Sequence, residues 1–72
     1  MPPNFKAWAV REMTSSLGNL TWGMSHLTAI IPILENGNEA DIVFAKELRG
    51  HVADIAEIKE DIRKTRDGYK KR

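Results

Sequence analysis

The feature that most constrains this chain is a seven-residue repeat of apolar side chains in its first half. Successive members are separated alternately by three and four residues, and all eight are apolar: Val10, Met13, Leu17, Leu20, Met24, Leu27, Ile31 and Leu34. Such a repeat lines one side of an α-helix and predicts packing against other helices. We expect these residues to form the seam of a helical bundle and to contribute to contacts between copies of the chain.

Two interpretations of this first helix remain open from the residues alone. Gly18 and Gly23 each cost roughly 1 kcal/mol relative to Ala inside a helix, and Gly18 followed by Asn19 is also typical of a turn. The segment forms either one helix over about 4–31 or two shorter helices that meet near Gly18. Because the apolar repeat keeps its register through Gly18, we favour one helix. Pro32 disfavours helical geometry in the preceding residue, which predicts fraying or a kink near 30–31.

A loop over 35–38 should connect this helix to a second one. Asn36 and Gly37 accept the left-handed conformation that often ends a helix, and Asn38 can cap the next one. The second helix is predicted over about 39–66, with Asp67 and Gly68 as its end and 67–72 as a basic tail. Its apolar face is predicted to comprise Phe44, Leu48, Val52, Ile55, Ile58, Ile62 and Tyr69.

These two apolar faces predict an all-α fold, an antiparallel helical hairpin formed by residues 1–72 as a single domain. A chain of 72 residues buries little surface alone, and small domains are usually stabilised by disulfides, metals or association. The sequence has no cysteine, which excludes disulfides and is consistent with a cytoplasmic protein. We therefore expect a homodimer or higher oligomer in which hairpins form a larger bundle.

The outer side of the first helix is unusual because residues 13–34 contain no Asp, Glu, Lys or Arg. Trp8 and Trp22 are fourteen residues apart and fall opposite the apolar repeat, and His26 follows Trp22 by one helical turn. Tryptophan is enriched in protein interfaces, since it buries a large area and keeps one polar group. We predict that Trp8, Trp22 and His26 contact a partner protein. The alternative is that they pack within an irregular bundle.

The last ten residues are strongly basic, with six cations and one carboxylate. Such a segment can bind phosphates in a salt-dependent way, which makes a small nucleic-acid-binding protein the alternative function. The simpler explanation is that cations stabilise the carboxyl end of a helix. The candidate phosphate contacts are Arg63, Lys64, Arg66, Lys70, Lys71 and Arg72.

Other functions find less support in the residues. The segment 13–34 has the length of a membrane span, but eight polar side chains interrupt it, and the first five residues lack the pattern of a secretory leader. Glu47, His51 and Asp54 lie within two turns of the second helix, a spacing that ordinary solvated helices also show, and we predict no metal site and no cofactor.

We find no phosphate-binding glycine motif and no arrangement of acid, base and nucleophile. The sequence therefore predicts a non-enzymatic helical protein that associates with itself. It would act as an assembly component, an adaptor or an inhibitor of a larger protein.

Overall fold

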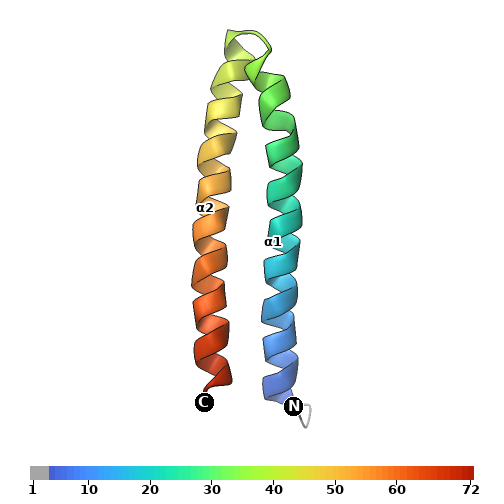
Figure 1. Cartoon of the computed structure of the whole chain (residues 1–72), viewed down its shortest axis with the longest axis vertical. Helices are drawn as coiled ribbons and strands as arrows, with labels where there is room; N and C mark the ends of the chain where they lie inside the picture. Colours follow the sequence, from blue (N-terminus) through green and yellow to red (C-terminus); the bar gives the residue numbers. More distant parts are fainter. Residues whose placement is uncertain (1–3) are drawn as a thin grey trace.

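The computed structural model describes residues 4–72, and two helices account for most of them. Helix α1 spans Phe5–Glu35 and helix α2 spans Glu39–Lys70. They run side by side in opposite directions, so that the three-residue loop lies at one end and both chain termini at the other (Figure 1). The described part measures 55 × 17 × 15 Å. The predicted all-α antiparallel hairpin is confirmed, while the leader prediction partly concerns residues 1–3, which lie outside the described residues.

Helix α1 is longer than predicted and continuous. It passes through Gly18 and Gly23, and it continues beyond Ile31 with Pro32 inside it. Because Pro32 lies in the last turn, its missing N–H removes one hydrogen bond close to the helix end. The same end gains hydrogen bonds from the backbone N–H groups of Asn36 and Gly37 to the carbonyls of Ile33 and Leu34, at 3.2 and 3.0 Å. The expected fraying near residues 30–31 is therefore wrong.

The loop confirms one prediction and corrects another. Asn38 caps α2 as expected: its side-chain oxygen accepts from the backbone N–H of Asp41 at 2.9 Å, and the Asp41 carboxylate accepts from the Asn38 N–H at 3.2 Å. The expected left-handed residue is absent from residues 4–72, since Asn36 has φ −94° and no described residue has a positive φ. Gly37 is instead required for space, because a Cβ there would collide with the Asp41 side chain.

Helix α2 also continues past its predicted end. Gly68 keeps a negative φ, and the Asp67 carboxylate accepts from Arg63 at 3.0 Å and from Arg66 at 3.1 Å. These contacts support the last turns, and Tyr69 is half-buried between the helices. The predicted tail over 67–72 is therefore mostly the final turn of α2 rather than a separate segment.

The interior of the hairpin is a narrow strip between the helices. All eight members of the α1 repeat are buried or half-buried, with Ile31 only 4% exposed. On α2 the strip includes Ala45, which is 1% exposed, together with Leu48, Val52, Ile55, Lys59, Ile62, Arg66 and Tyr69. Phe44 and Ile58, which we predicted to lie on this face, are instead 55% and 50% exposed. Their expected places are taken by Ala45 and Lys59, each one residue further along the chain.

Candidate interaction surfaces

The seam of α1 packs against α2 of the same chain along the length of the hairpin. This accounts for the apolar repeat without a second copy, and the predicted use of Val10 to Leu34 in contacts between copies stays a prediction. The repeat nevertheless defines the geometry of every other surface. Residues that follow seam members lie on one side of the hairpin, residues that precede them lie on the other, and those between face outward.

The side formed by residues that follow seam members is here called the threonine flank. On α1 it contains three threonines, Thr14, Thr21 and Thr28, each of which donates its hydroxyl to the carbonyl four residues earlier at 2.8–2.9 Å. Such bonds satisfy the hydroxyl within the helix, so that this uncharged surface leaves fewer polar groups to be hydrated. On α2 the same flank contains Arg49, Ala56 and Arg63.

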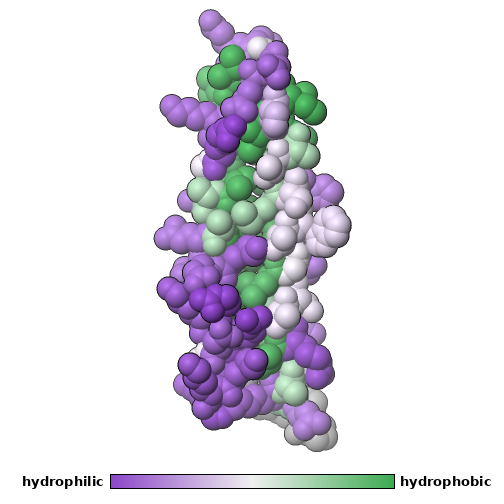
Figure 2. All heavy atoms as spheres, viewed as in Figure 1, coloured by the Kyte–Doolittle hydropathy of each residue, from purple (hydrophilic) through white to green (hydrophobic). Residues whose placement is uncertain are grey.

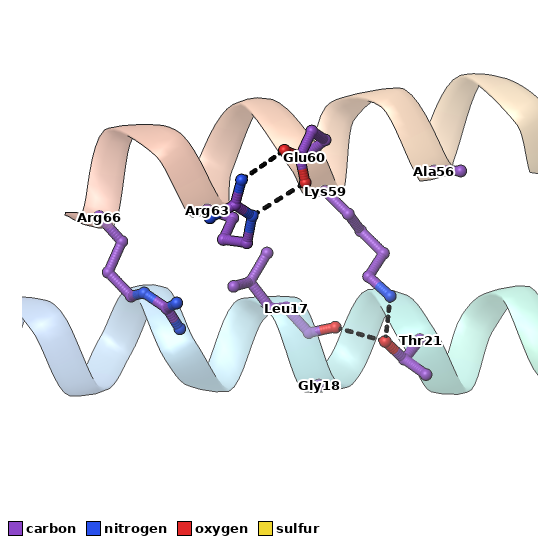
Figure 3. Close-up of a pocket in the computed structure, with 8 residues that line it drawn as sticks. All are labelled: Leu17, Gly18, Thr21, Ala56, Lys59, Glu60, Arg63 and Arg66. Carbon is purple, nitrogen blue, oxygen red and sulfur yellow. Dashed lines mark hydrogen bonds and ion pairs between the residues drawn. The ribbon is translucent and has the colours of Figure 1, made fainter. Parts of the chain in front are cut away.

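Side chains from α2 cross the threonine flank to α1. Lys59 donates to the hydroxyl of Thr21, Arg66 reaches Thr14 at 3.4 Å, and Arg49 forms an ion pair with Glu35 at 2.7 Å. A groove of about 450 Å³ lies here, lined by Leu17, Gly18, Thr21 and Ala56 with the surrounding charged residues of α2 (Figure 3). Contacts within the chain therefore cross this flank and leave a groove between them.

The cations of this groove are partly neutralised by neighbouring carboxylates. Arg63 pairs with Glu60 at 2.5 Å and with Asp67 at 3.0 Å (Figure 3). The hydrogen bond from Arg63 lowers the pKa of Glu60 below its ordinary value, and the hydrogen bond from Arg66 does the same for the pKa of Asp67. Both carboxylates are consequently charged at neutral pH, and the groove offers less free positive charge than its arginines suggest.

The opposite side is here called the apolar flank, and it is defined by the residues that precede alternate seam members, from Val10 to Ile31 on α1 and from Ala45 to Arg66 on α2. On α1 it contains Ala9, Ser16, Gly23 and Ile30, and on α2 it contains Phe44, His51, Ile58 and Thr65. Its large side chains are well exposed, at 44% for Ile30, 55% for Phe44 and 50% for Ile58. A Cβ added to Gly23 would meet nothing within 4 Å. No other part of the described chain covers this flank, which the sequence did not indicate because Phe44 and Ile58 were assigned to the interior.

The predicted partner residues lie on the outer side of α1, and the structure leaves them exposed. Trp22 is 69% exposed and lies beside His26, with ring centroids 6.4 Å apart. Trp8 is 44% exposed and lies beside Phe5, with ring centroids 5.6 Å apart. Since fourteen helical residues span about 21 Å, the two tryptophans belong to separate aromatic pairs on one face. The alternative in which they pack inside the hairpin is not what the described chain shows.

The open end of the hairpin gathers positive charge. Residues 4–20 and 60–72 carry eight basic and four acidic side chains, whereas residues 21–59 carry three basic and six acidic ones. Among the predicted phosphate contacts, Arg63 and Arg66 are engaged by carboxylates, and Lys64, Lys70, Lys71 and Arg72 are exposed. The fold adds Lys6, which donates to the carbonyl of Arg72 and lies 6.0 Å from the ring centre of Tyr69. Because Lys6 is far from this segment in sequence, only the antiparallel arrangement could have indicated it.

Within residues 4–72 no three His, Asp or Glu side chains are placed to hold a metal ion, and Glu47, His51 and Asp54 are exposed along α2. Neither α1 nor α2, as described, combines the length and apolarity that a membrane span requires. Comparison with protein-family models, with curated proteins and with solved structures finds no match to this chain.

Proposed function

We propose that this chain is a small non-enzymatic protein–protein interaction module that self-associates and acts as an assembly component, an adaptor or an inhibitor of a larger protein. The observation that carries the proposal is the imbalance between its covered and uncovered apolar residues. Only Ile31 and Ala45 among the described residues are fully buried. The exposed large apolar side chains are Phe5, Trp8, Trp22, Ile30, Ile33, Ile42, Val43, Phe44 and Ile58.

Large exposed apolar patches mark interaction sites on soluble proteins. The hydrophobic side chains gather toward the loop end, whereas the open end is mainly hydrophilic (Figure 2). The tryptophan pairs supply large rigid groups of the type that dominate binding energy at interfaces. Trp22 and His26 are the side chains we expect to contact a partner of different sequence, with Trp8 extending that contact.

Size-exclusion chromatography with light scattering tests the self-association directly. A folded monomer that persists from low to high micromolar concentration would contradict the proposal. Two variants then separate the surfaces. Leu20→Glu places a charge in the seam and should unfold the hairpin, while Trp22→Ala should leave the helical content and oligomeric state unchanged and weaken capture of a partner from the native host. Equal loss of folding in both variants would show that Trp22 is part of the interior.

A second candidate function is nucleic-acid binding, favoured by the basic surplus at the open end. There Lys6 lies 6.0 Å from the ring centre of Tyr69, and Lys64, Lys70 and Lys71 are exposed. This candidate predicts an affinity that falls steeply with salt concentration and that is largely lost when Lys64, Lys70 and Lys71 are replaced by Gln. Fluorescence anisotropy with a labelled oligonucleotide at two salt concentrations distinguishes it, since an affinity independent of salt would contradict phosphate contacts.

A further inference from the structure

The apolar flank runs along the whole hairpin and is left uncovered by the chain itself. We propose that a second copy of this chain packs antiparallel on this flank, so that α1 contacts α1 and α2 contacts α2 of the other copy. The proposal rests on the self-association proposed above and specifies its surface and geometry. It assigns the contact between copies to the flank and not to the seam or the tryptophan pairs.

The exposed area of the hairpin matches what such a contact would remove. A compact monomer of 8.2 kDa is expected to expose about 4,500 Å² and to have a radius of gyration of about 11 Å. The hairpin exposes 5515 Å² and has a radius of gyration of 16.7 Å. Its excess of about 1,000 Å² is close to the roughly 800 Å² that each partner buries in a standard protein interface. Pairing two hairpins would therefore bring the exposed area per chain close to that of a compact monomer of the same mass.

The two flanks differ in the way that this proposal requires. The threonine flank is crossed by the contacts of Lys59, Arg66 and Arg49 with α1, which leave separate grooves between them. The apolar flank instead has small residues along most of α1, and Ala9, Ser16 and Gly23 give another helix room to approach. At Gly23 nothing in the chain lies within 4 Å of the position that a Cβ would take, so that a second helix has room to approach there.

Charge determines the direction of packing. The half of the hairpin around the loop has three more acidic than basic side chains, and the open half has four more basic than acidic ones. A parallel pair would place two basic ends together. An antiparallel pair places each basic end against an acidic half, which is the complementary arrangement. Along α2 alone the same polarity holds, with an acidic surplus over 39–59 and a basic surplus over 60–72.

A twofold axis relates the two copies of the antiparallel pair, and the positions of the flank residues locate this axis. Thr21 and Lys59 are in contact near the middle of the hairpin, and Gly23 and Ile58 lie one or two residues away at the same height. An axis at this height brings Gly23 close to Gly23 and Ile58 close to Ile58 of the second copy. It also places Ile30 over Ser16 of the second copy, so that a large side chain meets a small one. Large side chains fit over small ones in the contacts between packed helices.

The first test replaces an apolar-flank residue and a matched outward residue on the same helix. Ile58→Glu should weaken the dimer about 100-fold or more, because a symmetric dimer contains the buried charge twice. Val43→Glu is the control, since Val43 is 55% exposed on the outer side of α2 and should leave the dimer intact. Sedimentation velocity of the full chain over a range of concentrations measures both, and circular dichroism checks that each variant remains helical.

A second test replaces a glycine with alanine. It should change the stability of the fold and the affinity of the dimer in opposite directions. Gly23→Ala should raise the midpoint of thermal unfolding measured at high dilution, because Ala favours the helix, and should weaken the dimer about tenfold. Gly18→Ala is the control on the same helix and the other side, where an added Cβ also meets nothing within 4 Å. It should raise the midpoint equally and leave the dimer unchanged.

A third test determines whether the two copies pack antiparallel or parallel. It introduces single cysteines into a chain that has no native cysteine. Ser16→Cys and Ile30→Cys proteins, mixed and oxidised, should form a mixed disulfide, and neither should crosslink efficiently to itself because like positions are about 21 Å apart. A parallel pair would instead join Ser16→Cys to Thr65→Cys.

The outcomes separate this inference from the function on which it rests. A wild-type chain that stays monomeric overturns both. A wild-type dimer that survives Ile58→Glu, that dissociates equally with Val43→Glu, or that crosslinks 16 to 65 overturns only the surface or direction proposed here.

Discussion

The loop half and the open half of this hairpin are closed by different interactions. Near the loop the strip between the helices is apolar from Ala45 to Ile55 on α2, and it contains Ile31 and Ala45, the two fully buried residues of the described chain. Toward the open end the α2 positions equivalent to Ala45 and Val52 are Lys59 and Arg66, which extend across to the hydroxyls of Thr21 and Thr14. The same seven-residue repeat is therefore filled by apolar side chains at one end and by long cations at the other.

This difference indicates a gradient of stability along the molecule. Apolar burial contributes about 25 cal/mol per Å², whereas exposed polar and ionic contacts contribute little each. The methylene chains of Lys59 and Arg66 cover some of the strip, but their charged groups remain near solvent. We expect the loop half to persist when the open half frays.

The largest expected effect comes from removing the central apolar contact of the loop half. Ile31→Ala should lower the free energy of unfolding by about 2–3 kcal/mol, since Ile31 is 4% exposed and its loss leaves a cavity. Ile62→Ala in the open half is the matched change and should cost about half as much, because Ile62 is only half-buried. Urea denaturation followed by circular dichroism measures both, and equal losses would contradict the gradient.

A smaller effect is expected at the turn that closes the loop half. Gly37→Ala should cost about 1 kcal/mol, because its Cβ displaces Asp41 and breaks the reciprocal cap with Asn38. Gly50→Ala is the control, since a Cβ there meets nothing within 4 Å, and it should stabilise α2 by up to about 1 kcal/mol. Thermal unfolding of the two variants should shift in opposite directions. A shift in the same direction would mean that the turn tolerates a side chain.

The stability of the open half should increase when its strip between the helices is made apolar like that of the loop half. Lys59→Leu completes the apolar strip and should stabilise the hairpin by about 0.5–1 kcal/mol. Lys64→Leu is the control, because Lys64 points outward and gains no burial. Hydrogen exchange should show slower exchange in residues 60–70 for Lys59→Leu alone. Unchanged exchange would show that the lysine stem already fills the strip.

The smallest effect concerns pH, and it should be confined to the open half. The pKa values of Glu60 and Asp67 are lowered by their arginine partners in the folded chain, from ordinary values of 4.5 and 3.8. A lowered folded pKa adds stability above the unfolded pKa, and that stability is lost as pH falls through the folded value. Hydrogen exchange in residues 60–70 should therefore increase below about pH 4 relative to residues 39–50, after correction for the intrinsic rate. Glu60→Gln should reduce this difference.

The sequence was sufficient for the hairpin, the α1 strip and the Asn38 cap, because each depends on local spacing or a local hydrogen bond. It misplaced the carboxyl-terminal ends of α1 and α2. At each of these ends, a residue that disfavours the helix is surrounded by contacts that stabilise it. Pro32 falls in a last turn next to the buried Ile31, and Gly68 lies between Asp67, held by two arginines, and the half-buried Tyr69. Propensity alone does not include such neighbours.

The larger error concerns α2 and the candidate site. Two columns of α2 residues lie side by side, and the members of each are seven residues apart. One column includes Phe44 and Ile58, and the other includes Ala45 and Lys59. Hydrophobicity favours the first column for the interior. In the folded chain the packing of the two helices turns the second column inward. The apolar flank is the direct result, and recognising it required the relative rotation of two helices, which no single-helix pattern contains.

The arrangement of the termini has a practical consequence. The start of α1 and the end of α2 lie at the same end of the hairpin, and the loop lies at the opposite end of a rod 55 Å long (Figure 1). Anything joined to the first or last described residue, such as a fluorophore, an affinity handle or a solid support, is thus held at one tip and leaves the other free. Immobilising the chain through either terminus should present the loop outward in the same orientation.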